Sequence, residues 1–310
     1  LTNIGNDKGL PDNYIYAITK DVNEKVWIGT DNGIAIYKSD DFSKPVKLLS
    51  QASGMPDNIA RTIFQDKKNA MWVGFQDNGA CYIDLSNYKV TVPEVFKKWK
   101  YGQVNDLIAY NNDVWIATEE RGLVNCNIKN INQTKCYESV NNDDLNSVEK
   151  LCYDNEGNIW LASNLGLIRT HGNWLSFLRK IDGTTITNVH SILCDNLNHI
   201  WFTPDMQLVE YNPNADSANS YAKYYVTPKD KHINIVTMRE DKYGYIWLGT
   251  LGSGILRFDP VTHKKQHITG NADIDNASVL AIEIVNDTLW VATYGGVMRC
   301  ALDADYNMRD

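Results

Sequence analysis

The sequence predicts an all-β protein, a seven-bladed β-propeller of four-stranded blades that occupies residues 1–310 as a single domain. Three observations support this fold class. One tryptophan context recurs seven times along the chain, a glycine follows it in most copies, and an aspartate precedes it in most copies. A repeat of about 40 to 45 residues is typical of a propeller blade of four short strands.

Seven of the nine tryptophans lie 45, 43, 45, 41, 46 and 43 residues apart. They are Trp27, Trp72, Trp115, Trp160, Trp201, Trp247 and Trp290. The first copy continues as Trp27-Ile28-Gly29-Thr30, and most other copies also have a small residue two positions after the tryptophan. We expect this segment to be the second strand of each blade. The indole would fill the space between blades, and the small residue would let neighbouring sheets approach.

Two turns are expected to flank this second strand. Six repeats have a glycine six or seven residues after the tryptophan, and the fifth repeat has Gln207 there instead. Glycine tolerates the positive φ of a tight turn. Five repeats have an aspartate six residues before the tryptophan, while the third and seventh repeats lack it and have a shorter turn. An aspartate at such a position bonds nearby backbone amides.

The other strands of each blade follow from the same alignment. The first strand carries an apolar pair such as Ile15 and Ile18, and the third strand follows the glycine, as in residues 34–37. The fourth strand is the least regular; residues 46–49 and 224–226 are examples. No single blade can bury both of its faces, so a ring of blades is needed.

The N-terminal residues are predicted to complete the last blade. Residues 1–4 precede Gly9-Leu10-Pro11-Asp12-Asn13 just as residues 46–49 precede Gly54-Met55-Pro56-Asp57-Asn58. The third strand of the seventh repeat ends near Cys300, and only ten residues follow. Residues 1–4 should therefore form the outer strand of blade seven and close the propeller. The first residue is leucine rather than methionine, which suggests a fragment of a longer protein.

The composition limits the possible partners and cofactors. Hydrophobic residues make up 43% of the chain, enough for a sizeable core. The formal net charge is −8, and this negative charge argues against nucleic acid as a partner. The six cysteines form no C-x-x-C pair, and the six histidines show no spacing typical of metal ligands. The sequence therefore predicts no cofactor, no metal and no catalytic residue. Cys126 and Cys136 flank a hairpin that we expect to turn near Ile131, so a disulfide and two thiols both remain open.

Candidate ligand-binding residues are expected at one end of the blades. The turns after the second strand and the connections between blades should share this end, and loops on a rigid scaffold often carry function. Carboxylates, amides and aromatic rings can bind the hydroxyls and ring faces of a sugar, and arginine pairs with planar oxyanions. The candidates are Arg61, Asp77, Glu119, Glu120, Arg121, His190, Asp205 and Tyr294.

The repeat resembles a known family at these residues. Gly9-Leu10-Pro11-Asp12-Asn13, then Asp21, Val26-Trp27-Ile28-Gly29-Thr30 and Gly33-Ile34 are similar to the two-component regulator propeller repeat. The resemblance implies the periplasmic sensor region of a hybrid two-component histidine kinase and response regulator of the Bacteroides type, anchored in the inner membrane. It also implies oligosaccharide ligands, a neighbouring propeller, an immunoglobulin-like domain and a homodimer as partners.

Three functions remain open from the sequence. The first is a ligand-sensing module that signals through domain rearrangement, which the resemblance favours. The second is a non-catalytic interaction or dimerisation propeller. The third is a propeller lyase, for which the adjacent Glu119 and Glu120 and the loop residue His190 would be the acid–base candidates. The fragment itself is predicted not to be an enzyme, although the resemblance implies a histidine kinase in the full-length protein.

Overall fold

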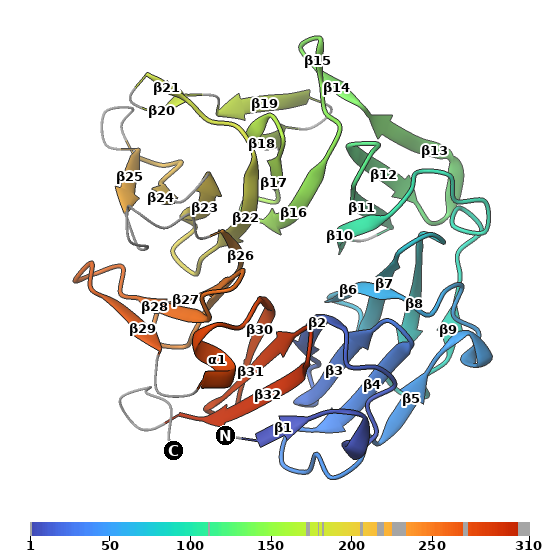
Figure 1. Ribbon diagram of the computed structural model, residues 1–310. Helices are drawn as coiled ribbons and strands as arrows, with labels where there is room; N and C mark the ends of the chain where they lie inside the picture. Colours follow the sequence, from blue (N-terminus) through green and yellow to red (C-terminus); the bar gives the residue numbers. More distant parts are fainter. Residues whose placement is uncertain are drawn as a thin grey trace. The chain divides into compact units, whose positions relative to one another are not determined.

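The structure of the protein is a computed structural model that describes residues 2–110, 112–171, 174–178, 180–181, 183–204, 207–215, 220–224, 234–268 and 272–302. In these residues seven four-stranded sheets form the blades of a β-propeller (Figure 1). The only α-helix among them is the single turn α1 (Ala272–Asp275). The predicted all-β propeller of four-stranded blades is confirmed.

The chain divides into two compact units, and each is described by itself. The first unit comprises Leu1–Cys136 and Leu280–Asp310 and holds blades one, two, three and seven. In sheet order the strands of blades one to three are β2 (Ile15–Lys20), β3 (Lys25–Thr30), β4 (Gly33–Lys38) and β5 (Lys47–Leu49); β6 (Ala60–Gln65), β7 (Ala70–Phe75), β8 (Ala80–Asp84) and β9 (Val90–Thr91); and β10 (Val104–Tyr110), β11 (Asp113–Thr118), β12 (Leu123–Asn127) and β13 (Asn130–Tyr137). Blade seven consists of β30 (Val279–Val285), β31 (Thr288–Thr293), β32 (Gly296–Ala301) and β1 (Thr2–Ile4).

The second unit comprises Tyr137–Val279 and holds blades four, five and six. Their strands are β16 (Val148–Tyr153), β17 (Ile159–Ser163), β18 (Gly166–His171) and β19 (Trp174–Leu178); β22 (Val189–Cys194), β23 (Ile200–Pro204), β24 (Leu208–Tyr211) and β25 (Tyr221–Tyr224); and β26 (Ile235–Glu240), β27 (Ile246–Thr250), β28 (Ile255–Phe258) and β29 (Lys265–Ile268). Two small hairpins precede blades four and five in the chain: β14 (Ser139–Val140) with β15 (Asp143–Asp144), and β20 (Lys180–Ile181) with β21 (Thr184–Thr185).

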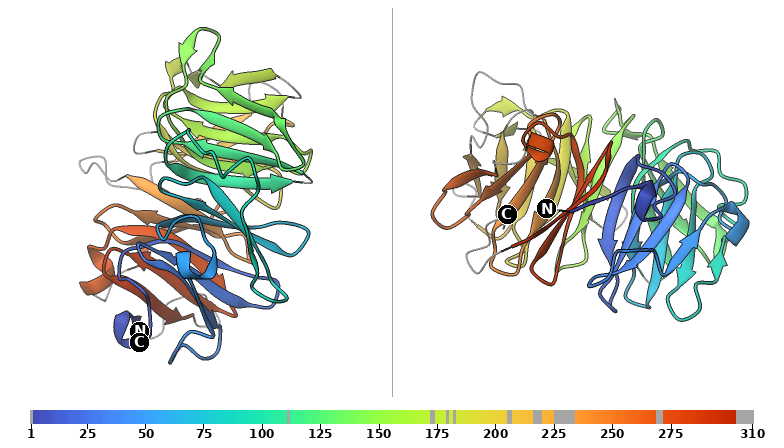
Figure 2. Two further views of the ribbon diagram at one scale, coloured as in Figure 1. Left: turned by 90° about the vertical axis from the view of Figure 1, so that its right-hand side faces the viewer. Right: turned by 60° about the horizontal axis from the view of Figure 1, so that its bottom comes forward.

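The N-terminal strand completes blade seven, as predicted. Strand β1 runs antiparallel to β32, and Thr2 and Ile4 lie opposite Arg299 and Val297. Figures 1 and 2 show the blue β1 beside the red β32. Ile4 is buried, with 1% of its surface exposed, so the strand adds to the core as well as to the sheet.

Each aspartate that lies six residues before a repeated tryptophan holds both the turn and the indole ring. Asp21 shows the pattern: its Oδ1 accepts bonds from the amides of Asn23 and Lys25, and its Oδ2 accepts one from Trp27 Nε1 at 3.0 Å. The indole bond recurs at Trp72–Asp66, Trp160–Asp154, Trp201–Asp195 and Trp247–Asp241. Blade seven lacks the aspartate, and Trp290 Nε1 has no hydrogen-bond partner among the described residues. The sequence predicted the turn bonds but not the indole bond.

The small residue after the tryptophan allows close packing of neighbouring blades in the first unit, as expected. A Cβ added to Gly29 would lie 2.7 Å from the carbonyl oxygen of Ala60 in blade two. A Cβ added to Gly74 would lie 2.5 Å from Cγ1 of Val104 in blade three. Real atoms cannot approach so closely, so larger residues at these positions would push the sheets apart.

Gly33, in the turn between β3 and β4, is expected to be intolerant of any side chain. Its φ is +111°, and an added Cβ would lie 2.4 Å from the carbonyl oxygen of Leu49. We predict that Gly33→Ala lowers the free energy of unfolding by about 2–4 kcal/mol, because strain and a backbone clash add together. Gly102→Ala is the matched control, since Gly102 has φ +75° but no atom within 4 Å of an added Cβ.

Chemical denaturation of the two glycine variants measures this difference. The control should lose only about 1 kcal/mol, the cost of positive φ for alanine. Equal losses in the two variants would show that the clash with Leu49 does not exist.

The structure places the disulfide elsewhere than the sequence suggested. Cys152 in β16 and Cys194 in β22 are bonded, with their Cα atoms 5.8 Å apart, so the innermost strands of blades four and five are linked covalently. The hairpin between β12 and β13 turns at residues 128–129 rather than near Ile131. Cys136 therefore lies beside Arg121, and the Cys136 thiol donates a hydrogen bond to the Arg121 carbonyl oxygen, with Sγ and O 3.3 Å apart. Cys126 is a buried thiol, and burial raises its pKa to about 12.

Candidate functional site

A β-bulge recurs where the first strand of a blade begins. In six sheets the register between the first two strands shifts after the first paired residue. The residues skipped in this way include Tyr16, Arg61 and Asn105 in the first unit and Glu149, His190 and Val236 in the second. A bulge redirects the side chain of its extra residue and is common beside functional sites. In the first unit β2 contacts β6 and β6 contacts β10, so the three bulges lie on neighbouring strands.

The bulge residues of blades one and two take part in a polar and aromatic cluster. Tyr16 Oη donates to Asp31 Oδ1 at 2.8 Å, and the guanidinium carbon of Arg61 lies 4.4 Å from the centre of the Tyr16 ring. The Asp31 amide donates to the Tyr14 carbonyl oxygen at 3.2 Å. The Tyr14 ring meets Tyr294 of blade seven edge to face, with centroids 5.9 Å apart. We call these five residues the tyrosine–arginine site.

The tyrosine–arginine site presents apolar rings and charged groups together. Tyr14 and Tyr294 are each 51% exposed, whereas Tyr16 is half-buried. Burial, followed by the bond to Asp31, raises the pKa of the Tyr16 phenol, so its hydroxyl stays protonated as a donor at neutral pH. Exposed tyrosines offer a flat apolar face with a polar tip, and the arginine fork matches a carboxylate or sulfate.

Blade three extends the polar surface of this end of the unit. Asn105, the bulge residue of β10, donates through Nδ2 to Glu119 Oε2 at 2.8 Å and accepts a bond from Gln103 Nε2 at 2.7 Å. Glu119 lies on the turn between β11 and β12, and its amide donates to the Gln103 carbonyl oxygen. The carboxylate is therefore held in place by the first strand of its own blade.

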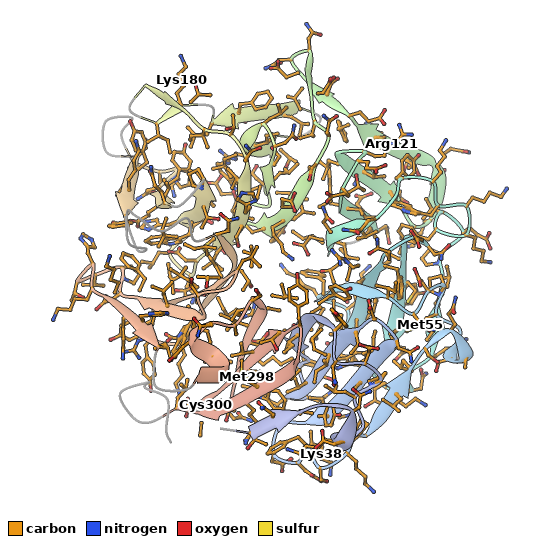
Figure 3. The ribbon with its side chains drawn as sticks, viewed as in Figure 1. Lys38, Met55, Arg121, Lys180, Met298 and Cys300 are labelled. Carbon is orange, nitrogen blue, oxygen red and sulfur yellow. A yellow bond between two sulfur atoms is a disulfide. The ribbon has the colours of Figure 1, made fainter. Side chains whose placement is uncertain are left out.

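The remaining predicted site residues are more scattered. Glu120 and Arg121 are exposed on the same turn as Glu119, and Figure 3 labels Arg121 on blade three. The Asp77 amide donates to Asp57 Oδ2 at 3.2 Å, which fixes the turn after β7. His190 lies in β22 of the second unit and is half-buried. Asp205 lies outside the described residues.

Arg61 and Tyr294 are among the residues predicted from the sequence, whereas Tyr14, Tyr16 and Asp31 are not. The structure brings these five residues together. A signal was present, because Tyr16 occupies the same place in its repeat as Arg61 and His190, directly after the first residue of the first strand. Among the described residues, no group of three His, Cys, Asp or Glu side chains is arranged to hold a metal ion. In the same part of the chain, no helix has the length and apolar character of a membrane span.

Comparisons with known structures show the fold. The chain matches the extracellular domains of two putative hybrid two component systems from B. thetaiotaomicron. Both are 18% identical to this chain, and the TM-scores are 0.77 and 0.73. The two matches cover 100% and 96% of this chain but only 44% and 41% of those chains. YCF48 from Cyanidioschyzon merolae matches with a TM-score of 0.68 at 13% identity, covering 94% of this chain and 96% of that chain. The chain thus spans less than half the length of these two extracellular domains.

Comparison with curated proteins gives no match. The profile of the family described as two component regulator propeller matches residues 9–32 and 230–252. The first segment covers the start of blade one, including Tyr14, Tyr16 and Asp31. On this evidence the chain is a β-propeller, and two of its segments are similar to the two component regulator propeller family.

Proposed function

We propose that residues 1–310 form a single propeller domain in the extracytoplasmic sensor region of a hybrid two-component signalling protein, and that the tyrosine–arginine site recognises an oligosaccharide. One observation carries this proposal: Tyr14 and Tyr294 are exposed side by side, and the chain of contacts through Asp31 and Tyr16 leads from them to Arg61. Two rings can stack on sugar faces while the arginine pairs with an acidic group.

Two further observations support the extracytoplasmic placement. Two of the matched solved structures are extracellular domains of putative hybrid two component systems. The bond between Cys152 and Cys194 fits an oxidising compartment such as the periplasm, since disulfides rarely persist in the bacterial cytoplasm. We propose that the full-length protein is a histidine kinase in the inner membrane and that this fragment has no enzymatic activity.

Signalling in this proposal needs a difference in affinity between two states. A ligand shifts an equilibrium only as far as it binds one state more tightly than the other. In the first unit the first strand of a blade pairs with the second strand and packs against the first strand of the next blade, so movement within a blade is disfavoured. The change is therefore proposed to occur between domains, namely a neighbouring propeller, an immunoglobulin-like domain and the second copy of a homodimer.

Isothermal titration of an acidic oligosaccharide tests the role of Arg61. We predict that Arg61→Gln weakens binding about tenfold or more, because a charge-assisted pair worth about 1.5–3 kcal/mol is lost. Arg121→Gln is the matched control: it removes an exposed arginine from the same end of the unit but outside the cluster. Equal loss in both variants would point to general electrostatic attraction and contradict a site at Arg61.

A further inference from the structure

The tryptophan of blade seven lacks the hydrogen bond that five other blades give to theirs. In those blades an aspartate lies six residues after the first residue of the first strand and accepts the indole N–H, as Asp21 does for Trp27. In blade seven Val285 stands at that place, six residues after Val279. Valine has no acceptor and no atom beyond its Cγ methyls. Trp290 is fully buried and its Nε1 has no hydrogen-bond partner among the described residues, so this donor calls for an acceptor.

A second donor group without an acceptor lies directly across the sheet from Trp290. Arg299 of β32 is the register partner of Trp290 in β31, and its guanidinium carbon lies 5.8 Å from the centre of the Trp290 ring and 4.1 Å from that of Phe42. A ring attracts the positive charge but offers no lone-pair acceptor to the N–H groups. Within the described part of the chain, Arg299 Nε is buried without a hydrogen-bond partner and no carboxylate pairs with the guanidinium. Burial accordingly holds the pKa of Arg299 below its ordinary value.

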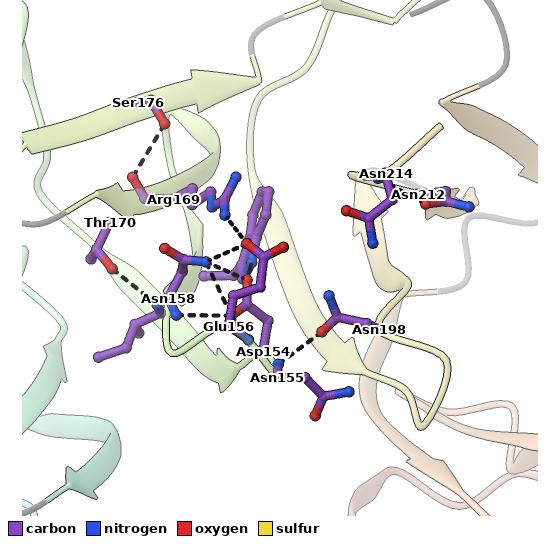
Figure 4. Close-up of polar contacts among 12 residues, drawn as sticks. Asp154, Asn155, Glu156, Asn158, Arg169, Thr170, Ser176, Asn198, Asn212 and Asn214 are labelled. Atoms are coloured by element: carbon purple, nitrogen blue, oxygen red, sulfur yellow. Dashed lines mark hydrogen bonds and ion pairs between the residues drawn. The ribbon is translucent and has the colours of Figure 1, made fainter. Parts of the chain in front are cut away.

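Blade four shows what the same two groups bind when acceptors are present. Arg169 is the register partner of Trp160, and its guanidinium carbon lies 5.3 Å from the centre of that ring. The indole donates to Asp154 Oδ2 at 2.9 Å, and Arg169 Nη2 donates to Glu156 Oε2 at 2.8 Å. Asn158 Nδ2 bonds both carboxylates, so the two acceptors lie close together (Figure 4). Arg169 Nε also has no partner, so blade seven differs in lacking the ion pair and the indole bond.

The first turn of blade seven supplies neither acceptor. It consists of two residues only, Asn286 and Asp287. The side-chain amide of Asn286 donates to Ser39 Oγ at 3.2 Å, and Asp287 is exposed. In the described residues no ion pair joins Asp287 to Arg299. Blade seven therefore has the two donors of blade four without the carboxylates that serve them.

We propose that a small monovalent anion, chloride in the first place, binds between Trp290 Nε1 and the guanidinium of Arg299. One such ion accepts hydrogen bonds from both donors and balances the charge of the arginine. A monatomic ion suits the place better than a larger anion, because Trp290 is fully buried and Arg299 is half-buried. The net charge of the chain is −8, so binding here comes from these two donors and not from general attraction of anions.

The proposed anion lies where the N-terminal strand completes blade seven. Arg299 is also the register partner of Thr2 in β1. Phe42, which its guanidinium contacts, comes from the turn between β4 and β5 of blade one. The ion therefore stabilises the contact of blade seven with its outer strand and with blade one. The tyrosine–arginine site includes Asp31, on the turn between β3 and β4 at the opposite end of the sheet, so this inference does not depend on the proposed function.

The direct test follows the indole N–H signals of the intact chain by NMR, after labelling its tryptophans with ¹⁵N. Sodium chloride replaces sodium gluconate at constant ionic strength, and Trp290→Phe identifies the Trp290 signal. We expect that signal alone to move, saturably, with a Kd on the order of 0.1 M or tighter for a single ion. The signals of the five indoles bonded to aspartates should stay in place. An unmoved Trp290 signal, or equal movement of all indoles, would overturn the proposal.

A pair of arginine variants tests the second donor. Arg299→Met should weaken the chloride response of Trp290 at least tenfold, because the balancing charge is lost. Arg257→Met is the matched control: Arg257 lies opposite Trp247 in blade six, whose indole already bonds Asp241. This control should leave the response within twofold. An unchanged response in a folded Arg299→Met variant, or equal weakening in both, would contradict a site at Arg299; if Arg299→Met does not fold, the titration of the unaltered chain still decides.

Discussion

Replacing Asp154 by alanine should lower the free energy of unfolding by about 3 kcal/mol or more, because one buried indole donor and two part-buried amide donors lose their acceptor at once. The Asp154 carboxylate accepts bonds from Trp160 Nε1 at 2.9 Å, from the Glu156 amide at 3.0 Å and from the Asn158 amide at 2.8 Å. Asp154 is only 1% exposed and its bond to Trp160 is buried, so water cannot replace that bond. Figure 4 shows Asp154 with Glu156 and Asn158 at this turn.

Asp259→Ala is a matched control in the same unit. Asp259 also accepts hydrogen bonds from two backbone amides, those of Val261 and Thr262. Its turn is more exposed than that of Asp154, and neither of these two bonds comes from an indole. We expect this variant to lose about 1 kcal/mol or less. Urea unfolding of the two variants separates the cases. A loss for Asp154→Ala no larger than that of the control would show that the indole bond and burial do not stabilise the blade.

Reducing the bond between Cys152 and Cys194 should lower stability by about 4 kcal/mol, the loop-entropy estimate for a closed loop of this length. The two cysteines are 42 residues apart in sequence and link the innermost strands of adjacent blades. A melting temperature several degrees lower in dithiothreitol is therefore expected. The double variant Cys152→Ser, Cys194→Ser should melt at the same lower temperature with or without the reductant.

Mass spectrometry after alkylation under non-reducing conditions identifies the bonded pair. In unfolded, unreduced protein, Cys81, Cys126, Cys136 and Cys300 should be modified and Cys152 and Cys194 should not. In the native state at pH 8 Cys81 and Cys126 should react slowly, because burial raises the pKa of both thiols. Modification of Cys152 and protection of Cys126 in the unfolded protein would contradict the observed pairing.

The blades could be predicted from sequence because each depends on local signals. The tryptophan, its aspartate and the following glycine lie within one repeat, and their periodicity gives the number of blades. The outer strand of blade seven could also be predicted, since residues 1–4 align with residues 46–49. These features need no knowledge of how one blade faces the next.

The disulfide and the tyrosine–arginine site depend on how one blade faces the next, which the repeat pattern does not show. Cys152 precedes Trp160 by eight residues and Cys194 precedes Trp201 by seven, so their side chains leave opposite faces of their sheets and can meet between blades. A one-residue bulge likewise decides where Tyr16 and Arg61 point. Strand register is set by strand pairing and by packing between blades. The residue pattern alone therefore gives Arg61 as a candidate but does not give the cluster around it.

A thermal-shift screen of the unaltered chain against neutral and acidic oligosaccharides is the most direct test of sugar recognition at the tyrosine–arginine site. A ligand at about one hundred times its Kd adds roughly 2.7 kcal/mol of stability, which corresponds to a readable shift for a domain of this size. We predict a shift with one family of oligosaccharides that is lost in the double variant Tyr14→Ala, Arg61→Gln. A cooperative melt with no shift for any sugar, or a shift that the double variant retains in full, would contradict recognition at the tyrosine–arginine site.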